Sequence, residues 1–420
     1  MTRVSDDIDL ASEAFENYKL YVNPPLARVM KLSGSPVEVR AQGTTIWDSN
    51  GKAYLDFAGG YGVFTLGHSH PRVISAVREQ MQAMSLSGKT MFNVMLGRAA
   101  KRLAEVTPGD LQISFWCNSG TEAVEGAIKL ARAATGRVKI VATHDAYHGK
   151  TLGALSISGR ETFQSPFRPL LADVEHIAFG DIGALDHALH DAAAFIVEPV
   201  QGEGGVNVPP LGYLNAVRAA CDRAGALFIA DEVQTGLGRC GYLFGVERDG
   251  VVPDVMTLAK GLSGGIIPVG AFIARPDVWN RAYQKLPLVH TSTFGGSEIA
   301  CAAALAAMDV LESDRLVDNA RDRGAELLSG VTRLAHEFPH VIAEVRGLGL
   351  LVGVELTNEG YGGWIIPEML KAGVTAAWTL NQQRVIRLEP PLVVTSDEVQ
   401  RAIAALRAGA ATALAKLGRL

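Results

Sequence analysis

A lysine stands at the end of an apolar run in the segment PDVMTLAKGLSGG, residues 253–265. The apolar residues 255–259 predict a short buried strand, and Lys260 follows it directly, ahead of glycine-containing turns. An unpaired lysine in an apolar place loses several kcal/mol of hydration, unless its pKa falls until the amine is neutral. The side chain therefore either reaches past the strand end to solvent, or is kept reactive for Schiff-base chemistry.

Carboxylates follow two further apolar runs. Asp231 and Glu232 come after residues 226–230, where the chain leaves the predicted sheet. They form a solvated turn, or Asp231 is partly buried and needs a partner such as a protonated ring nitrogen. Glu198 and Glu203 flank a proline and a glycine-rich loop in EPVQGEGG, which is either a glutamate-bearing turn or part of a site.

The start of a predicted helix in CNSGTEA is a candidate phosphate site. Ser119 and Glu122 predict a capping box, which by itself explains the pattern as a well-capped helix. Gly120 also lets a phosphate approach the free N–H groups of the helix start, with the hydroxyls of Ser119 and Thr121 as further donors. Both interpretations can hold together.

Histidines occur in two short loops. Tyr147 and His148 precede a glycine in DAYHGKTLGAL, which is typical of a packed loop and also compatible with a ligand site. His68 and His70 in GHSHP lie two residues apart, with no acidic or thiol partner nearby. A structural turn is expected there, and no metal site is predicted.

The composition is that of a soluble globular protein. The 420 residues exceed what one core usually holds, and 48% are apolar and 20% charged. A net charge of −5 without a basic run argues against nucleic acid or an anionic membrane as partner, and favours small molecules. Four widely spaced cysteines suggest no disulfide framework. The acidic N-terminus lacks an export signal and no apolar run could span a bilayer, so a cytoplasmic location is expected.

Apolar runs alternate with helical patterns through the middle of the chain. The predicted strands are residues 113–119, 138–145, 174–180, 193–200, 226–233, 254–261 and 269–276. Most are continuous apolar runs, which is typical of strands covered on both faces. This alternation predicts a large, mostly parallel α/β sheet, in which ligands bind beyond the carboxyl ends of the strands.

The two ends of the chain predict a second unit. Residues 37–57 predict a hairpin, and residues 314–338 a long helix that leads into strands and a final alanine-rich helix from about residue 396. The expected division is a large domain of residues 61–315 and a smaller α+β domain formed by residues 1–60 and 316–420.

Seven segments occur together and in order: LGHSHP, CNSGTEAVEGAIKLAR, YHGKTLGAL, EPVQGEGGV, ADEVQTGLGR, LAKGLSGG and HTSTFGG. In this combination the chain, from about residue 37 to residue 395, resembles the class III (subgroup II) aminotransferases, which are pyridoxal 5'-phosphate (PLP) enzymes of fold type I. The segments PFRPLL, HTSTFGG, ACAAALA and TLNQQRVIRLEPPLVVT are most similar to putrescine aminotransferases.

The resemblance implies roles for the candidate residues. Lys260 would form the Schiff base with PLP and then carry the proton between the substrate α-carbon and the cofactor, while Asp231 keeps the pyridine nitrogen protonated. Val233 and Tyr147 would pack on the two ring faces, and Gln234 would bind the ring oxygen. The predicted cofactor-binding set is Ser119, Gly120, Thr121, Tyr147, His148, Glu198, Asp231, Val233, Gln234, Lys260 and Thr293.

Three further residues are predicted to act on the substrate. By the resemblance Glu203 and Arg387 can pair with one another when the substrate end has no carboxylate, and Arg387 can otherwise bind an α-carboxylate through two hydrogen bonds. Trp378 replaces a small residue of the similar putrescine enzymes and is expected near the substrate channel. Thr293 resembles the threonine that reaches the phosphate from the partner subunit, which implies a homodimer with shared active sites.

The function expected from these features is PLP-dependent transamination. The expected donor is a terminal amine such as putrescine or another diamine, and the acceptor 2-oxoglutarate or pyruvate. Alternatives are an aminotransferase for an aldehyde or ketone intermediate of a biosynthetic pathway, or an ornithine, acetylornithine or 4-aminobutyrate type of enzyme. A PLP- or nucleotide-binding regulator without turnover is disfavoured by the joint presence of Lys260, Asp231, Glu203 and Arg387.

Overall fold

A seven-stranded sheet forms the centre of the computed structural model, which describes residues 9–418. Its order is β4-β10-β9-β8-β7-β5-β6, and only β10 runs antiparallel to its neighbours β4 and β9. All seven predicted strands are confirmed: β4 (Ile113–Cys117), β5 (Lys139–Thr143), β6 (Val174–Ile177), β7 (Ala192–Val197), β8 (Leu227–Asp231), β9 (Val255–Leu258) and β10 (Gly270–Ala274).

Helices cover both faces of this sheet, which explains why the central strands are apolar throughout. Every residue of β7, β8, β9 and β10 is buried. Successive side chains alternate between two apolar cores: Ile140 and Ala142 of β5 pack in one, and Val141 packs in the other. The first core is closed by α5 (Gly120–Thr135) and α10 (Pro276–Tyr283), and the second by α9 (Tyr213–Ala224) and α11 (Glu298–Ser313).

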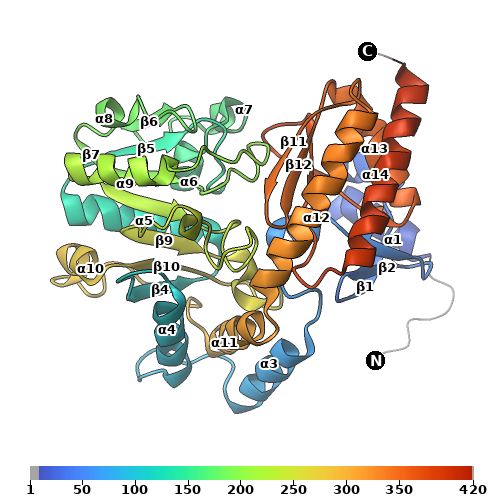
Figure 1. Ribbon diagram of the computed structural model, residues 1–420. Coiled ribbons are helices and arrows are strands. Elements are labelled where there is room, and N and C mark those ends of the chain that lie inside the picture. The colour runs from blue at the N-terminus through green and yellow to red at the C-terminus, as the bar shows by residue number, and fades with distance from the viewer. Residues whose placement is uncertain (1–8, 419–420) are drawn as a thin grey trace.

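Shorter elements complete this part of the chain. They are α3 (Pro71–Ala83), α4 (Val94–Val106), α6 (Leu152–Ile157), α7 (Glu161–Gln164), α8 (Leu185–Ala188) and the short 3-10 helices η2 (Gly59–Gly62), η3 (Ser165–Phe167), η4 (Gly245–Arg248) and η5 (Lys260–Ser263). Figure 1 shows α3 and α4 with α11 below the sheet, and α9 packs against β7 and β8.

Two smaller sheets lie beside the large one. The first has the order β1-β2-β3-β13, with β1 (Glu38–Gln42), β2 (Thr45–Asp48), β3 (Ala53–Asp56) and β13 (Val374–Thr375). The second has the order β11-β12-β15-β14, with β11 (Ile342–Leu348), β12 (Leu351–Leu356), β15 (Val385–Leu388) and β14 (Ala377–Trp378). The prediction of a hairpin at residues 37–57 was incomplete, because two turns divide the segment into three antiparallel strands.

The N-terminal and C-terminal segments meet in space. Strand β3 pairs in parallel with β13, more than three hundred residues later. Helices η6 (Glu359–Tyr361), α12 (Leu316–Glu337), α13 (Gly362–Lys371) and α14 (Ser396–Leu417) lie on the same side of Figure 1 as α1 (Leu10–Asn17), which leads through the π-helix η1 (Tyr18–Val22) into α2 (Pro24–Leu32). The exact boundaries near residues 60 and 316 stay a prediction, and residues 1–8 and 419–420 lie outside the described part.

Two further observations concern the whole described chain. No helix among residues 9–418 is long and apolar enough to cross a membrane. The four cysteines, Cys117, Cys221, Cys240 and Cys301, are free and buried.

Candidate active site

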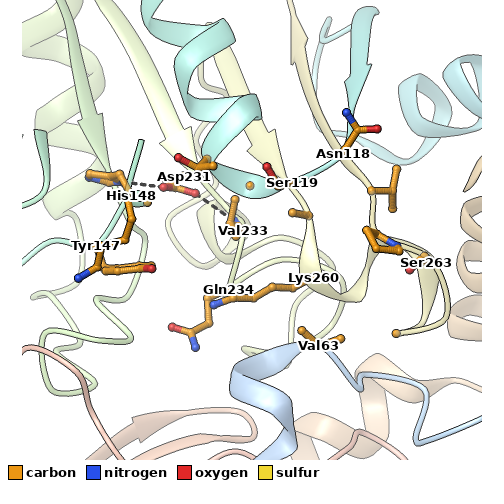
Figure 2. Close-up of a pocket in the computed structure, with 18 of the residues that line it drawn as sticks. Val63, Asn118, Ser119, Tyr147, His148, Asp231, Val233, Gln234, Lys260 and Ser263 are labelled. Atoms are coloured by element: carbon orange, nitrogen blue, oxygen red, sulfur yellow. Dashed lines mark hydrogen bonds and ion pairs between the residues drawn. The ribbon is translucent and has the colours of Figure 1, made fainter. Parts of the chain in front are cut away.

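A cavity of about 660 Å³ opens at the carboxyl ends of β8 and β9. This is where a mostly parallel sheet presents its loops to a ligand, and the volume lies in the usual range of small-molecule sites. Ten residues predicted from the sequence line it: Ser119, Gly120, Thr121, Tyr147, His148, Glu198, Asp231, Val233, Gln234 and Lys260. Figure 2 shows how several of them converge from separate loops.

Lys260 follows the buried strand β9 and turns into the cavity instead of reaching bulk solvent. Its backbone has φ of +43°, an uncommon conformation for a residue with a side chain, and its side chain extends toward Gln234 (Figure 2). Burial lowers the pKa of Lys260, against the opposing effect of the Glu389 and Glu203 carboxylates. Among the described residues its amine forms no hydrogen bond or ion pair, so Nζ is available to a ligand.

Asp231 ends β8 with its carboxylate fixed on both oxygens. Oδ2 lies 2.6 Å from Nδ1 of His148, while Oδ1 accepts hydrogen bonds from Thr257 Oγ1 at 2.9 Å and from the Val233 N–H at 3.1 Å. Burial opposes the charged form of His148, but Asp231 outweighs this effect and the pKa of His148 is raised. A carboxylate held this firmly can keep a proton on a basic ring nitrogen that enters the cavity.

The N-terminus of α5 forms another wall of the cavity. Ser119 accepts a hydrogen bond from the Glu122 N–H at 3.3 Å, so it caps the helix. The predicted capping box is only half formed, because the Glu122 carboxylate instead accepts the Asn118 N–H at 2.6 Å. A Cβ on Gly120 would lie 2.9 Å from Val233 Cγ1, so a larger residue would fill the space beside the helix start. This geometry suits an anion such as phosphate.

Glu198 lies near the Asp231–His148 pair and contacts the backbone of Tyr147. The Glu198 carboxylate accepts the Tyr147 N–H at 3.1 Å and the Gly202 N–H at 3.3 Å. Burial raises the pKa of Glu198 to about 7, with Asp231 adding to the rise and His148 opposing it. Burial also raises the pKa of Tyr147, so its ring stays neutral.

Glu203 and Arg387 form a buried ion pair at the inner side of the site. Arg387 Nη1 donates to Glu203 Oε1 at 2.8 Å, and both side chains are almost fully buried. The Nη2 atom of Arg387 is buried and has no hydrogen-bond partner among the described residues. Burial raises the pKa of Glu203, but Arg387 and Lys260 outweigh this effect and hold it below its ordinary value. A ligand carboxylate that displaced Glu203 would therefore find an open donor.

Glu389 was missed by the sequence analysis and belongs to the same cluster. Its side chain is fully buried, with Oε2 3.1 Å from Arg387 Nε and Oε1 3.6 Å from Nε of the equally buried Arg239. Oε2 also accepts a hydrogen bond from Gln234 Nε2 at 3.2 Å. The available signal was its place two residues after Arg387, directly past the end of β15, where an extended chain keeps both side chains on one face.

Lys150 is a second residue that the sequence analysis missed. It follows Tyr147 and His148 in the same loop and lines the cavity. Its Nζ lies 3.2 Å from the centre of the Phe163 ring, a cation–π contact. Burial lowers the pKa of Lys150, and the nearby Arg160 adds to the effect.

Trp378 lies in β14, at the edge of the second small sheet. In the pairing of β14 with β15, Ala377 is opposite Arg387 and Trp378 is opposite Ile386, so the indole is on the face of the sheet away from Arg387. The indole packs against the start of α13, because a Cβ on Gly362 would come within 1.5 Å of Trp378 Cη2. Trp378 does not line the cavity of its own chain, and its expected place near the substrate channel stays a prediction.

Thr293 is exposed and does not line the cavity of its own chain. It lies in the loop before α11, next to Phe294, whose side chain is 61% exposed. A role in the site of a second subunit stays a prediction.

The GHSHP segment forms a structural pair. His68 Nε2 lies 2.8 Å from Asp56 Oδ2, and both side chains are buried. Among the described residues no group of three or more histidine, cysteine or acidic side chains could hold a metal ion.

Comparison with known proteins identifies the chain. Residues 33–409 match the family model of the class III aminotransferases. The protein belongs to this family. It therefore has the fold type I architecture and uses PLP, and the cavity fits this cofactor, since a free amine, a fixed carboxylate and an open helix N-terminus all face it.

Solved structures of aminotransferases are similar over nearly the whole chain. Ornithine aminotransferase of Toxoplasma gondii ME49 is 33% identical, with 98% of this chain and 97% of that chain covered and a TM-score of 0.90. A thermostable (S)-enantioselective omega-transaminase from Thermomicrobium roseum is 31% identical, with 96% and 99% covered and a TM-score of 0.88. An amine transaminase from an uncultivated Pseudomonas species is 30% identical, with 90% and 95% covered and a TM-score of 0.84.

The buried position of Glu198 predicts a pH-dependent stability. Its pKa is about 7 in the folded chain against an ordinary 4.5, so between these values the folded state holds a proton that the unfolded state has lost. The stabilisation of the folded state by this extra proton is complete below about pH 4.5 and is lost as the pH rises to 7. A glutamine at this position cannot titrate, so the free energy of unfolding of Glu198→Gln should rise by roughly 1–3 kcal/mol relative to that of wild type across this range.

Urea unfolding of the cofactor-free proteins at a series of pH values measures this difference. A constant difference between the two proteins from pH 4.5 to 7 would contradict the raised pKa of Glu198.

Proposed function

We propose that this aminotransferase takes the amino group from a terminal amine, one whose reacting carbon bears no carboxylate, and passes it to 2-oxoglutarate or pyruvate. The ion pair of Arg387 with Glu203 at 2.8 Å carries the proposal. With the pair closed, Arg387 is neutralised and the site accepts a substrate end without charge. The names of the similar proteins, ornithine aminotransferase and amine transaminase, support a donor of this kind.

The same residues serve the acceptor half of the reaction when the pair opens. An α-keto acid brings a carboxylate that replaces Glu203 at Arg387, and the unpartnered Nη2 supplies the second hydrogen bond of a bidentate contact. One site can then alternate between two unlike substrates without leaving a buried charge unpaired. Putrescine, another diamine and ornithine through its terminal amine all satisfy this requirement.

The roles of the cavity residues follow from their positions. PLP, when bound, withdraws electrons from the carbon that carries the amino group, so that a proton can leave it. Lys260 Nζ, whose pKa is lowered by burial and which has no partner among the described residues, would bond the cofactor and carry that proton. Asp231 would keep a proton on a ring nitrogen, with its own carboxylate fixed by His148. Val233 and Tyr147 would flank the ring, and Glu198 holds the Tyr147 backbone through its N–H.

The remaining cavity residues hold the rest of the cofactor. Ser119, Gly120 and Thr121 would bind the phosphate together with the first N–H groups of α5. The amide of Gln234 donates to the Tyr61 carbonyl at 3.1 Å and to Glu389, which fixes its orientation, and the Gln234 side chain would bind the ring oxygen.

A homodimer is part of the proposal. Large apolar side chains are exposed in the loop before α4 and in the loop before α11, including Met91 (85%), Phe92 and Leu288 (82%). Exposed apolar side chains gathered in this way favour association. Thr293 lies in the second of these loops and does not line its own cavity, and in the proposed dimer it would reach the cavity of the partner subunit.

Lys260 is expected to be the residue that bonds PLP. Borohydride reduction followed by peptide mapping should label the peptide that contains Lys260. Lys150 also lines the cavity and is the matched alternative, so Lys150→Ala should still be labelled at Lys260. Lys260→Ala should bind PLP without a covalent bond and lose turnover. A label on Lys150 in the wild-type protein would refute the assignment.

Thr293→Ala should weaken PLP retention without changing the fold, because it removes a phosphate contact from the partner subunit. Dialysis followed by cofactor titration measures retention, and Thr291→Ala, an exposed neighbour in the same loop, is the control. A monomer that remains saturated with PLP and active in sedimentation would disprove the shared site.

The decisive experiment measures the two half-reactions separately. Single-turnover conversion of the cofactor should proceed with putrescine, cadaverine or ornithine as donor, and back with 2-oxoglutarate or pyruvate. Arg387→Ala should slow the keto-acid half-reaction by about tenfold or more in specificity constant, since it loses charge-assisted hydrogen bonds. The amine half-reaction should change much less.

Arg223→Ala is the control, because Arg223 pairs with Asp186 at the surface and does not line the cavity. Equal losses in both half-reactions of Arg387→Ala would mean that Arg387 supports the site as a whole. Conversion by α-amino acids alone would contradict the proposed donor.

A further inference from the structure

We propose that the loop of residues 379–384, between β14 and β15, sets how firmly Glu203 covers Arg387, and thereby sets the preference between a terminal amine and a carboxylate-bearing substrate. The inference rests on the proposed function, because it assigns a control element to the same ion pair. The loop acts through its backbone, so its residues are positioning residues.

The loop holds Glu203 at two atoms. The Leu380 N–H donates to Glu203 Oε2 at 2.7 Å, and the Asn381 N–H donates to the Glu203 carbonyl oxygen at 2.9 Å. Glu203 Oε1 is taken by Arg387 at the same time. Both carboxylate oxygens are thus engaged only when Glu203 faces Arg387, so the Leu380 N–H stabilises the covered state.

Hydrogen bonds to loops of the large sheet hold the loop in this place. Asn381 Nδ2 donates to the carbonyl oxygens of Asp145 at 2.8 Å and Ala146 at 3.2 Å, the two residues before Tyr147. Arg160 Nη1 donates to the carbonyl oxygen of Leu380. The backbone of Leu380 is therefore bound at both of its polar groups, its carbonyl oxygen by Arg160 and its N–H by Glu203.

The strand side of the loop is equally constrained. Thr379 is buried, its N–H donates to the Val385 carbonyl at 3.0 Å and its hydroxyl donates to the Gln382 carbonyl at 2.6 Å. The preceding Trp378 packs its ring on Gly362 of α13, so the loop cannot slide along the sheet. The Leu380 side chain is itself 39% exposed, so Leu380 acts on the site through its backbone N–H.

A looser loop is expected to change the ligand preference in one direction. If the Leu380 N–H no longer holds Glu203, the covered state loses a hydrogen bond to a charged group, while a ligand carboxylate at Arg387 loses nothing. Arg387 is then uncovered more often, so ligands with a carboxylate bind more tightly and amines without a carboxylate do not. General damage to the site would instead weaken both kinds of ligand.

Asn381→Ala tests this consequence in the PLP-loaded enzyme. The ratio of single-turnover rates, glutamate over putrescine, should rise by about three- to tenfold, the usual effect of one such hydrogen bond. Calorimetric binding of glutarate, a dicarboxylate that cannot react, should tighten by a similar factor. Arg160→Gln, at a partly exposed position, should raise the rate ratio and tighten glutarate binding as well. It tests the inference if Asn381→Ala does not fold.

Two comparisons make the outcome decisive. Asn215→Ala removes an amide-to-carbonyl hydrogen bond of the same kind, 2.9 Å to Asp249, away from Glu203, and should change neither quantity. Equal slowing of both half-reactions, weaker glutarate binding or no change in Asn381→Ala and Arg160→Gln would overturn the inference. Glu203→Gln should raise the same ratio directly. If it does not, or if wild type converts no terminal amine, it is the proposed function that fails.

Discussion

The active site depends on the balance of four buried charges beside Lys260. Arg387 and Arg239 face Glu203 and Glu389, and an unpaired charge at this depth would cost several kcal/mol. The two carboxylates are not equivalent. Glu389 is fully buried at the end of β15, whereas Glu203 lies in a glycine-rich loop and keeps a small exposed area. In the proposed switch Glu203 is therefore the carboxylate that leaves, when another carboxylate takes its place at Arg387.

This balance explains why the lysine can remain a free amine. Lys260 has carboxylates near enough to raise its pKa and burial that lowers it, and burial prevails. A direct ion pair with Glu389 or Glu203 would hold the amine protonated and unreactive. Both carboxylates are already committed to arginines, so they stabilise the cluster without binding the amine. The positive φ at Lys260 completes the arrangement, because it turns the side chain off the strand axis and into the cavity.

Much of the large sheet and the cavity wall could be predicted from the sequence. Continuous apolar runs mark strands that are covered on both faces, and polar residues directly after them must lie at one edge of a parallel sheet. Asp231, Glu198 and Lys260 were found in this way. The insertion of antiparallel β10 between β4 and β9 could not be predicted, because an apolar run carries no information on strand direction or on partners distant in sequence.

The places of side chains that adjoin Arg387 in the sequence were harder to predict. Glu389 stands in a proline-rich turn and has the appearance of an exposed loop residue, yet it is the second counter-ion of Arg387. Trp378 was expected near the channel because similar enzymes carry a small residue there. The two-residue period of a strand places it on the face away from Arg387 and leaves Ala377 opposite Arg387, and it does not line the cavity of its own chain. In the proposed switch its influence passes through the backbone that follows it, which presents the Leu380 N–H to Glu203.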